Sequence, residues 1–156
     1  MSPDKHITSG IILGAGAYLL TKDITLAEAA ALSAFVCDFD HALEYGAYCF
    51  EYKKAPTLRE FSSGRYFETK GRIVLVFHAY EYLILFTLAA LITHNSIAKG
   101  TALGYALHLI LDTIGNDCTF VGYWIIYRAL VKFKIHRICG KGKEKNEDDF
   151  NSNANI

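Results

Sequence analysis

The sequence predicts an all-α protein: an up-down bundle of four membrane-embedded helices, with a fifth helix that either spans or lies in the membrane interface. Apolar residues make up 52% of the 156-residue chain, and only two prolines interrupt it. Residues 73–93 form an apolar run broken only by His78 and Glu81, close to the length that crosses a bilayer core of about 30 Å. The glycines are scattered or helically spaced, which favours helices over strands and turns.

The expected helices follow the apolar segments along the chain. The first covers 6–20 and ends at a short polar turn. Thr25 with Glu28 three residues later forms a capping-box pattern, so the second helix is expected from about 26 to 52. The remaining helices are expected at 72–93, 97–114 and 120–138. One helical domain therefore covers 1–139, and the polar segment 140–156 is expected to be a disordered tail.

Charge predicts an orientation and excludes one class of partner. The 16 basic and 16 acidic residues balance, so no nucleic-acid partner is expected. Basic residues gather in the loop 53–71, which the positive-inside rule places in the cytoplasm. We therefore expect an integral membrane protein of the cytoplasmic or inner membrane, with membrane lipids as partners. A soluble helical bundle, its helices buried on most faces, is the alternative.

The four cysteines predict reduced thiols and no disulfide framework. Cys37, Cys49, Cys118 and Cys139 show no CxxC spacing. Cys37 lies beside a candidate site, where it is either a ligand or, as we expect, a small buried apolar residue.

Ionisable side chains recur inside the apolar segments, where they are costly and mark functional positions. His108 and Asp112 share one helix face because they are four residues apart. Asp38 and His41, like His78 and Glu81, are three apart, and His6 begins the first helix. Measured from the outer ends of their helices, these residues lie in one layer roughly 16–24 Å down. Four separate segments are thus expected to converge on one site.

Glycine spacing predicts which helices meet above this site. His6, Gly10 and Gly14 repeat every four residues, as do Gly100, Gly104 and His108. Each run is a GxxxG pattern that permits close helix contact. We expect the first and fourth helices to pack directly against each other.

Imidazoles and carboxylates on facing helices are typical of sites for one to three metal ions. The expected ligands are His6, Asp38, His41, His78, His108 and Asp112. Asp40 or Glu81 is expected to act as general base or bridging carboxylate. Several histidines favour zinc, with manganese or iron as alternatives. The chain has no GxSxG, P-loop or HExxH motif, which excludes serine hydrolases, nucleotide triphosphatases and zincins.

Three segments also carry a resemblance to a known family. His6, the segment Asp38-Phe-Asp-His41 and the segment from Gly104 to Asp112 resemble predicted membrane-bound metal-dependent hydrolases of bacterial inner membranes. They are more distantly similar to zinc-dependent phospholipase C and related single-strand nucleases. The likeness spans most of residues 1–115 and implies the same six metal ligands. Cys37 stands where the family often has proline, and His78-Ala-Tyr-Glu81 departs from its middle motif.

The expected function is a membrane-bound metal-dependent hydrolase. A metal-activated water would attack a phosphodiester or ester of a small-molecule or lipid-linked substrate. The same residues are also compatible with a non-catalytic metal-binding or ion-translocating membrane protein. A soluble all-α phosphohydrolase of the His-Asp type ranks last, because the chain has no adjacent His-Asp pair.

Overall fold

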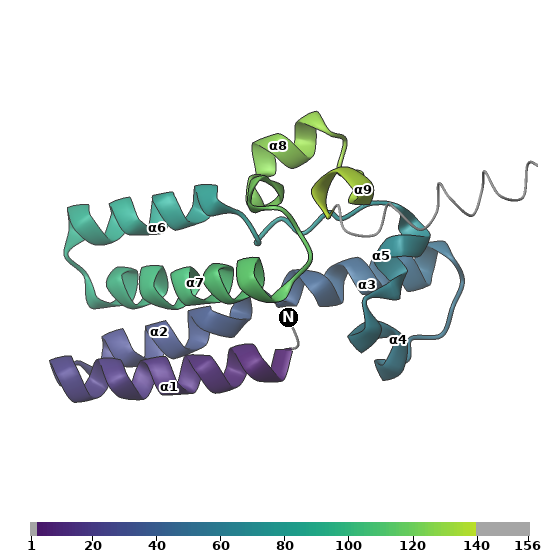
Figure 1. Ribbon diagram of the computed structural model, residues 1–156. Helices are drawn as coiled ribbons and strands as arrows, with labels where there is room; N and C mark the ends of the chain where they lie inside the picture. Colours follow the sequence, from purple (N-terminus) through teal and green to yellow (C-terminus); the bar gives the residue numbers. More distant parts are fainter. Residues whose placement is uncertain (1–2, 140–156) are drawn as a thin grey trace, which may run out of the picture.

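The computed structural model describes residues 3–139, in which all regular secondary structure is helical (Figure 1). The all-α prediction is confirmed. The predicted tail 140–156 lies outside the described residues. The helices are α1 (Pro3–Thr21), α2 (Ile24–Val36), α3 (Phe39–Glu51), α4 (Leu58–Ser63), α5 (Arg65–Lys70), α6 (Tyr80–Thr93), α7 (Ser96–Gly115), a 3₁₀ turn (Phe120–Tyr123), α8 (Ile125–Leu130) and α9 (Ile135–Ile138).

The described chain has two parts (Figure 1). In the first, which we call the helical body, α6 packs on α7, α7 on α2, and α2 on α1. In the second, the cap, α3, α4, α5, α8 and α9 gather at the end of the body where α2 passes into α3. The site lies where these two parts meet.

The glycines of α1 and α7 both pack on α2, which lies between them. A Cβ added at Gly10 would come within 2.8 Å of the Ala31 carbonyl oxygen, and one at Gly104 would collide with the Ala30 carbonyl oxygen. The two glycine runs therefore pack on α2 and not on each other, whereas α1 and α7 do meet at the site, where the His6 ring stacks on His108. The small alanine side chains of α2 allow close approach on both of its faces. The glycines of α1 pack on one face, and those of α7 pack on the other.

The second predicted helix, 26–52, is divided at Cys37 and Asp38. The chain tightens there through i→i−3 hydrogen bonds, from the Asp38 N–H to the Phe35 carbonyl and from the His41 N–H to the Asp38 carbonyl. Apolar periodicity continues through the break, which is why the sequence does not reveal it. The turn places Asp38 and His41 at the start of α3, beside the end of α7.

The third predicted helix, 72–93, begins only at Tyr80, and the residues before it, which we call the extended segment, are non-helical, with a turn and a bend at 76–78. Arg72 pairs with Lys134 in an isolated bridge, and beyond it side chains satisfy the backbone of this segment. The Val74 N–H donates to the Glu44 carboxylate, and the Phe77 N–H donates to the Asp40 carboxylate. Buried side chains donate to its carbonyl groups. The Arg128 guanidinium donates to the carbonyl oxygens of Leu75 and His78. The Tyr105 hydroxyl lies within hydrogen-bond distance of the carbonyl oxygens of Phe77 and Ala79.

Within residues 3–139, no helix combines the length and the apolar character that crossing a membrane requires. The prediction of four membrane-embedded helices, of an integral membrane protein and of a cytoplasmic loop 53–71 is therefore wrong. Only the second part of the apolar run 73–93 is helical, as α6. The expected helix 120–138 is divided into three short helical segments, the 3₁₀ turn, α8 and α9. The longer helices α1 and α7 include glycines and polar residues.

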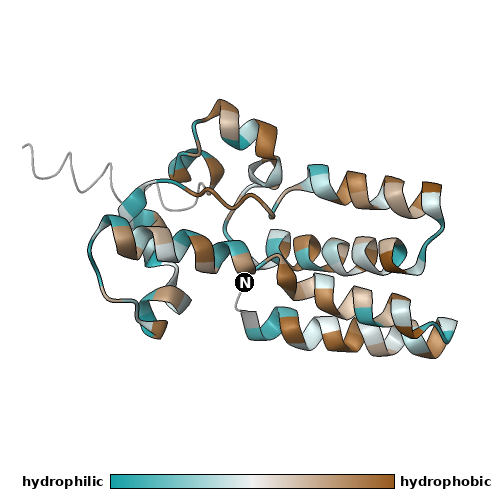
Figure 2. Ribbon diagram, turned by 180° about the vertical axis from the view of Figure 1, so that it is seen from behind, coloured by the Kyte–Doolittle hydropathy of each residue, from teal (hydrophilic) through white to brown (hydrophobic). Residues whose placement is uncertain are grey.

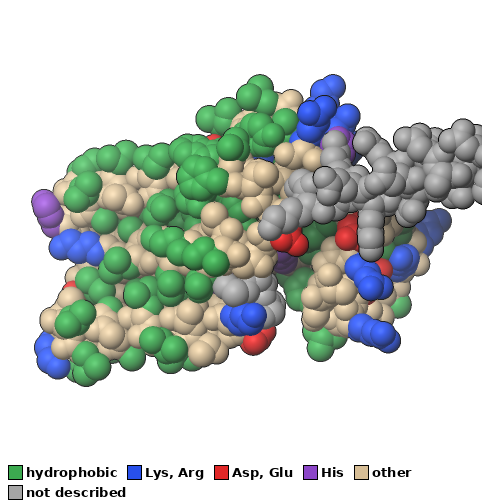
Figure 3. All heavy atoms as spheres, in the orientation of Figure 1, with side chains coloured by type: hydrophobic (Ala, Val, Ile, Leu, Met, Phe, Trp, Pro, Cys, Tyr) green, Lys and Arg blue, Asp and Glu red, His purple; other side chains and the backbone are tan. Residues whose placement is uncertain are grey.

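The helical body carries many exposed apolar side chains. Ile12, Leu20 and Ile92 are among the most exposed, and apolar residues colour much of α1 and α6 (Figure 2). Figure 3 shows such side chains spread over one face of the body, while charged side chains gather mainly toward the cap. Burial of polar groups is concentrated at the junction of the two parts.

Candidate metal centre

The junction of body and cap brings together all six predicted ligands. They come from α1 (His6), the start of α3 (Asp38 and His41), the extended segment (His78) and α7 (His108 and Asp112). His6, His78, His108 and Asp112 are each no more than 1% exposed. Buried ionisable groups are rare unless they are paired or bind a metal. Three overlapping groups of these residues have ligand atoms close enough to share an ion.

Four of these ligand atoms, which we call the central set, surround one point. His78 Nε2 and His108 Nε2 are 3.0 Å apart. Asp112 Oδ2 lies 3.4 Å from His78 Nε2 and 3.6 Å from His108 Nε2. Asp38 Oδ1 lies 3.6 Å and 4.0 Å from the same two nitrogens. A tetrahedral ion with bonds of about 2.0–2.1 Å separates its ligand atoms by about 3.3 Å. These five spacings, from 3.0 to 4.0 Å, are close to that value, and His78, His108 and Asp112 together can hold an ion.

Hydrogen bonds behind the two imidazoles decide where their lone pairs point. His78 Nδ1 is hydrogen-bonded to Asp40 Oδ2 at 3.2 Å, and a carboxylate only accepts, so Nδ1 carries the proton. His108 Nδ1 donates to the Ala34 carbonyl oxygen at 2.8 Å. Both neutral rings therefore present a lone pair at Nε2. Two lone pairs that face each other at 3.0 Å require a cation between them, either a proton or a metal ion.

The pKa values of the cluster agree with a cation at this point. Burial lowers the pKa of His78, but hydrogen bonds to Asp38 and Asp40 outweigh it and raise the pKa to about 9. Burial lowers the pKa of His108 to about 4. Burial raises the pKa of Asp112, yet the hydrogen bond from His6 and the charge of His78 hold it below its usual range. Without a metal, one proton on His78 occupies the place of the cation.

His6 lies on the buried side of the central set. Its Nε2 is 3.0 Å from Asp112 Oδ1, and its ring stacks on His108 with 4.2 Å between centroids. Among the described residues its Nδ1 has no hydrogen-bond partner. Through Asp112, His6 holds the other carboxylate oxygen toward the centre.

His41 lies on the opposite side of the central set. Its Nε2 is 3.9 Å from Asp38 Oδ1, and its Nδ1 is 3.4 Å from the Tyr66 hydroxyl. Burial lowers the pKa of His41 to about 4, so the ring is neutral at pH 7.

The two carboxylates expected to act as bases have other positions. Asp40 contacts His78 at Nδ1, on the side away from the central set, and also accepts the Phe77 N–H. Both oxygens of Glu81 accept backbone N–H groups at the start of α8, from Ile125 and Ile126. Asp40 thus orients His78, a candidate ligand, and Glu81 caps the start of α8.

Arg128 lies in the expected helix 120–138 and was not among the predicted site residues. Arg128 is 2% exposed and donates to the carbonyl groups of Gly122, Leu75 and His78. It thereby fixes the extended segment that carries His78. An arginine inside an apolar stretch was the available signal, since the same reasoning selected the buried histidines.

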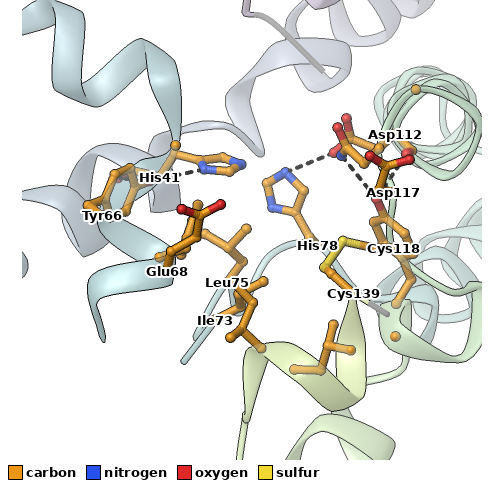
Figure 4. Close-up of a pocket in the computed structure, with 18 of the residues that line it drawn as sticks. His41, Tyr66, Glu68, Ile73, Leu75, His78, Asp112, Asp117, Cys118 and Cys139 are labelled. Atoms are coloured by element: carbon orange, nitrogen blue, oxygen red, sulfur yellow. Dashed lines mark hydrogen bonds and ion pairs between the residues drawn. A yellow bond between two sulfur atoms is a disulfide. The ribbon is translucent and has the colours of Figure 1, made fainter. Parts of the chain in front are cut away.

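A cavity of about 480 Å³ opens beside the cluster, and Asp38, His41, His78 and Asp112 line it. In Figure 4, His41, His78 and Asp112 lie around its inner end, and Ile73 and Leu75 form part of the wall. The cavity gives a small molecule access to ligands that are otherwise buried.

A disulfide between Cys118 and Cys139 also forms part of this wall (Figure 4). The expectation that all four cysteines are reduced is therefore wrong for this pair. The chain after α7 and the end of α9 meet through the hydrogen bond from the Thr119 N–H to the Ile138 carbonyl, a contact that no sequence spacing reveals. Cys37 and Cys49 are free and buried, and burial raises the pKa of Cys37 to about 12.

Fold and site together define a helical protein with a buried His/Asp site that can bind a metal ion. No family model matches the chain, and no match is found among the curated proteins or the solved structures. The resemblance to metal-dependent hydrolases therefore stays a prediction that rests on the residues themselves.

Proposed function

We propose that this protein is a metal-dependent hydrolase, with zinc as the first choice of ion and manganese or iron as alternatives. The observation that carries the proposal is the pair of facing Nε2 lone pairs, completed by two carboxylates and reached from a cavity. Two nitrogen and two oxygen ligands suit zinc. Bound zinc lowers the pKa of water to about 7 and so supplies hydroxide at neutral pH.

The chain's own residues hold and orient this centre. His78, His108, Asp38 and Asp112 bind the ion, and Asp40 keeps the proton of His78 on Nδ1. A carboxylate behind a ligating histidine raises the basicity of that ligand.

The cavity favours an ester or phosphodiester with an apolar group next to the reacting bond. Its walls include Ile73, Leu75 and Ile138. Arg128 is the only lysine or arginine among those that line it, and its guanidinium is already bound by three backbone carbonyl groups. A phosphate monoester with two negative charges would find no free lysine or arginine among these lining residues.

A non-catalytic metal site is the second candidate, and one observation favours it. Structural zinc sites have four protein ligands, whereas catalytic sites keep one position open. The central set already offers four protein atoms.

Metal content and hydrolysis, measured on the full chain, test both candidates. Wild type is expected to retain zinc and to hydrolyse bis(p-nitrophenyl) phosphate or p-nitrophenyl butyrate, and His108→Ala and Asp38→Ala are expected to lose both properties. His94→Asn is the matched control, because His94 is exposed at the end of α6 with a positive φ that asparagine tolerates. Metal without hydrolysis would leave the second candidate, and wild type without bound zinc, manganese or iron would refute both.

A further inference from the structure

The cluster contains more donor atoms than one tetrahedral ion can use. With the central set assigned, two donors remain on residues that line the cavity: His41 Nε2, which lies 3.9 Å from Asp38 Oδ1, and the second carboxylate oxygen of Asp38. This Asp38 Oδ2 is buried and has no hydrogen-bond partner among the described residues. An unpartnered buried carboxylate oxygen is costly unless a cation satisfies it.

The hydroxyl of Tyr66 sets the direction of the His41 lone pair. It donates to the His41 carbonyl oxygen at 3.5 Å and therefore accepts from His41 Nδ1 at 3.4 Å. The proton of the neutral ring is then on Nδ1, and Nε2 presents its lone pair toward Asp38. His41 thus repeats the arrangement of His78 and His108, in which a partner behind the ring leaves Nε2 free for a cation.

We propose a second divalent-cation site on the cavity side of the cluster, held by His41 Nε2 and by Asp38, whose carboxylate bridges the two ions. Ligand atoms of His41, Asp38 and His78 lie within 4.8 Å of one another. Ions in two-metal sites are about 3.5–4 Å apart, a separation that one bridging carboxylate spans.

The second ion has the open coordination that the first lacks. His41 and Asp38 both line the cavity, so water or a substrate oxygen completes the coordination of an ion bound there. With two protein ligands, this ion binds more weakly than the first and exchanges more readily. The inference concerns metal binding alone and stands whether or not the protein hydrolyses an ester.

Titration of the metal-free full chain with Mn²⁺, followed by the electron paramagnetic resonance signal of free Mn²⁺, tests the second site. Wild type is expected to bind two equivalents, the second at least about tenfold more weakly, with a spin-coupled signal when both sites are filled. His41→Gln is expected to bind one equivalent without the coupled signal, and His94→Asn to bind two. Uptake of a single equivalent by wild type, or of two by a folded His41→Gln, overturns the proposal.

Tyr66→Phe provides a second variant that keeps every proposed ligand. Without the hydroxyl, His41 Nδ1 loses its partner, and the affinity of the second site is expected to fall several-fold while the first is unchanged. If His41→Gln does not fold, this variant decides the question. Equal weakening of both sites, or no change in either, overturns the proposal.

Discussion

At the scale of single residues, the partner behind each imidazole determines what the ring can bind. His78 and His108 have Nδ1 engaged by Asp40 and by the Ala34 carbonyl group, so both Nε2 atoms point into the centre. Asp38 and Asp40 have the same side chain two residues apart, but only Asp38 lies near the two Nε2 atoms. Asp40 lies behind His78, at Nδ1, where it can orient this candidate ligand.

Replacement of Asp40 by asparagine is expected to weaken zinc binding by about 10- to 100-fold, because the neutral amide lowers the basicity of His78. Competition with a chromogenic chelator measures the change. Glu44→Gln is the control, since Glu44 lies one turn further along α3 and binds the Val74 N–H and Lys70 away from the centre. Equal affinities in Asp40→Asn and wild type would show that Asp40 does not support the ligand.

Metal binding is expected to release about one proton at pH 7. The pKa of His78, raised to about 9, keeps its ring protonated in the metal-free protein, and a ligand must be deprotonated to bind metal. Zinc affinity therefore rises about tenfold per pH unit toward pH 9. In the metal-free fold the stabilisation from this proton is complete below pH 6.5 and is lost as the pH rises through about 9.

Calorimetric titration with zinc at pH 7, in two buffers of different ionisation enthalpy, counts the protons released. Identical apparent enthalpies in the two buffers would contradict the expected release.

At the scale of elements, α2 is the centre of the helical body. Its alanines contact the glycines of α1 on one side and of α7 on the other. This close approach sets where His6 and His108 meet, because the two helices are placed by the same neighbour. The extended segment before α6 is placed instead by side chains that bind its backbone, with Asp40, Glu44 and Arg128 prominent among them.

Gly104→Ala is expected to destabilise the protein by about 1–3 kcal/mol, the usual cost of overpacking. The added Cβ would collide with the Ala30 carbonyl oxygen and the Ser33 hydroxyl, so α2 and α7 must separate. Gly46→Ala is the control, because nothing lies within 4 Å of a Cβ at this exposed position of α3. It is expected to stabilise by about 0.5–1 kcal/mol.

Urea unfolding of both glycine variants measures these changes. A Gly104→Ala protein as stable as wild type would show that the two helices do not pack this closely.

At the scale of the whole molecule, the cap closes the site that the body begins. The helical body supplies His6, His108 and Asp112, whereas the cap supplies the walls of the cavity. The Cys118–Cys139 bond joins the chain that leaves α7 to the end of α9. It therefore ties the last helix of the cap to the helix that carries two of the ligands.

Replacement of both Cys118 and Cys139 by serine is expected to cost about 3 kcal/mol, the value for a closed loop of roughly 20 residues. Thermal unfolding with and without dithiothreitol measures the effect. The reductant is expected to lower the Tm of wild type toward that of the double variant and to leave the variant unchanged. A wild-type Tm that does not respond to the reductant would show that the bond does not stabilise the fold.

Helix positions were predictable where local pattern decided them. The expected segments 6–20 and 97–114 lie within α1 and α7, because apolar spacing and glycine repeats are local signals. The breaks at Cys37 and before Tyr80 were not predictable. Each involves side chains from elsewhere in the fold that bind backbone groups. His108 binds the Ala34 carbonyl group just before the first break, and Asp40 and Arg128 bind the segment before Tyr80.

The sequence by itself determined that the protein is helical and which buried imidazoles and carboxylates are costly enough to need partners. Those properties follow from residue type and spacing along one segment. Only the tertiary structure decided that the glycine runs of α1 and α7 both pack on α2, that Glu81 caps α8, that Asp40 supports His78, and that no helix in residues 3–139 is fit to cross a membrane. These outcomes depend on which residue, distant in the sequence, accepts or donates each hydrogen bond. The local sequence pattern does not specify that partner.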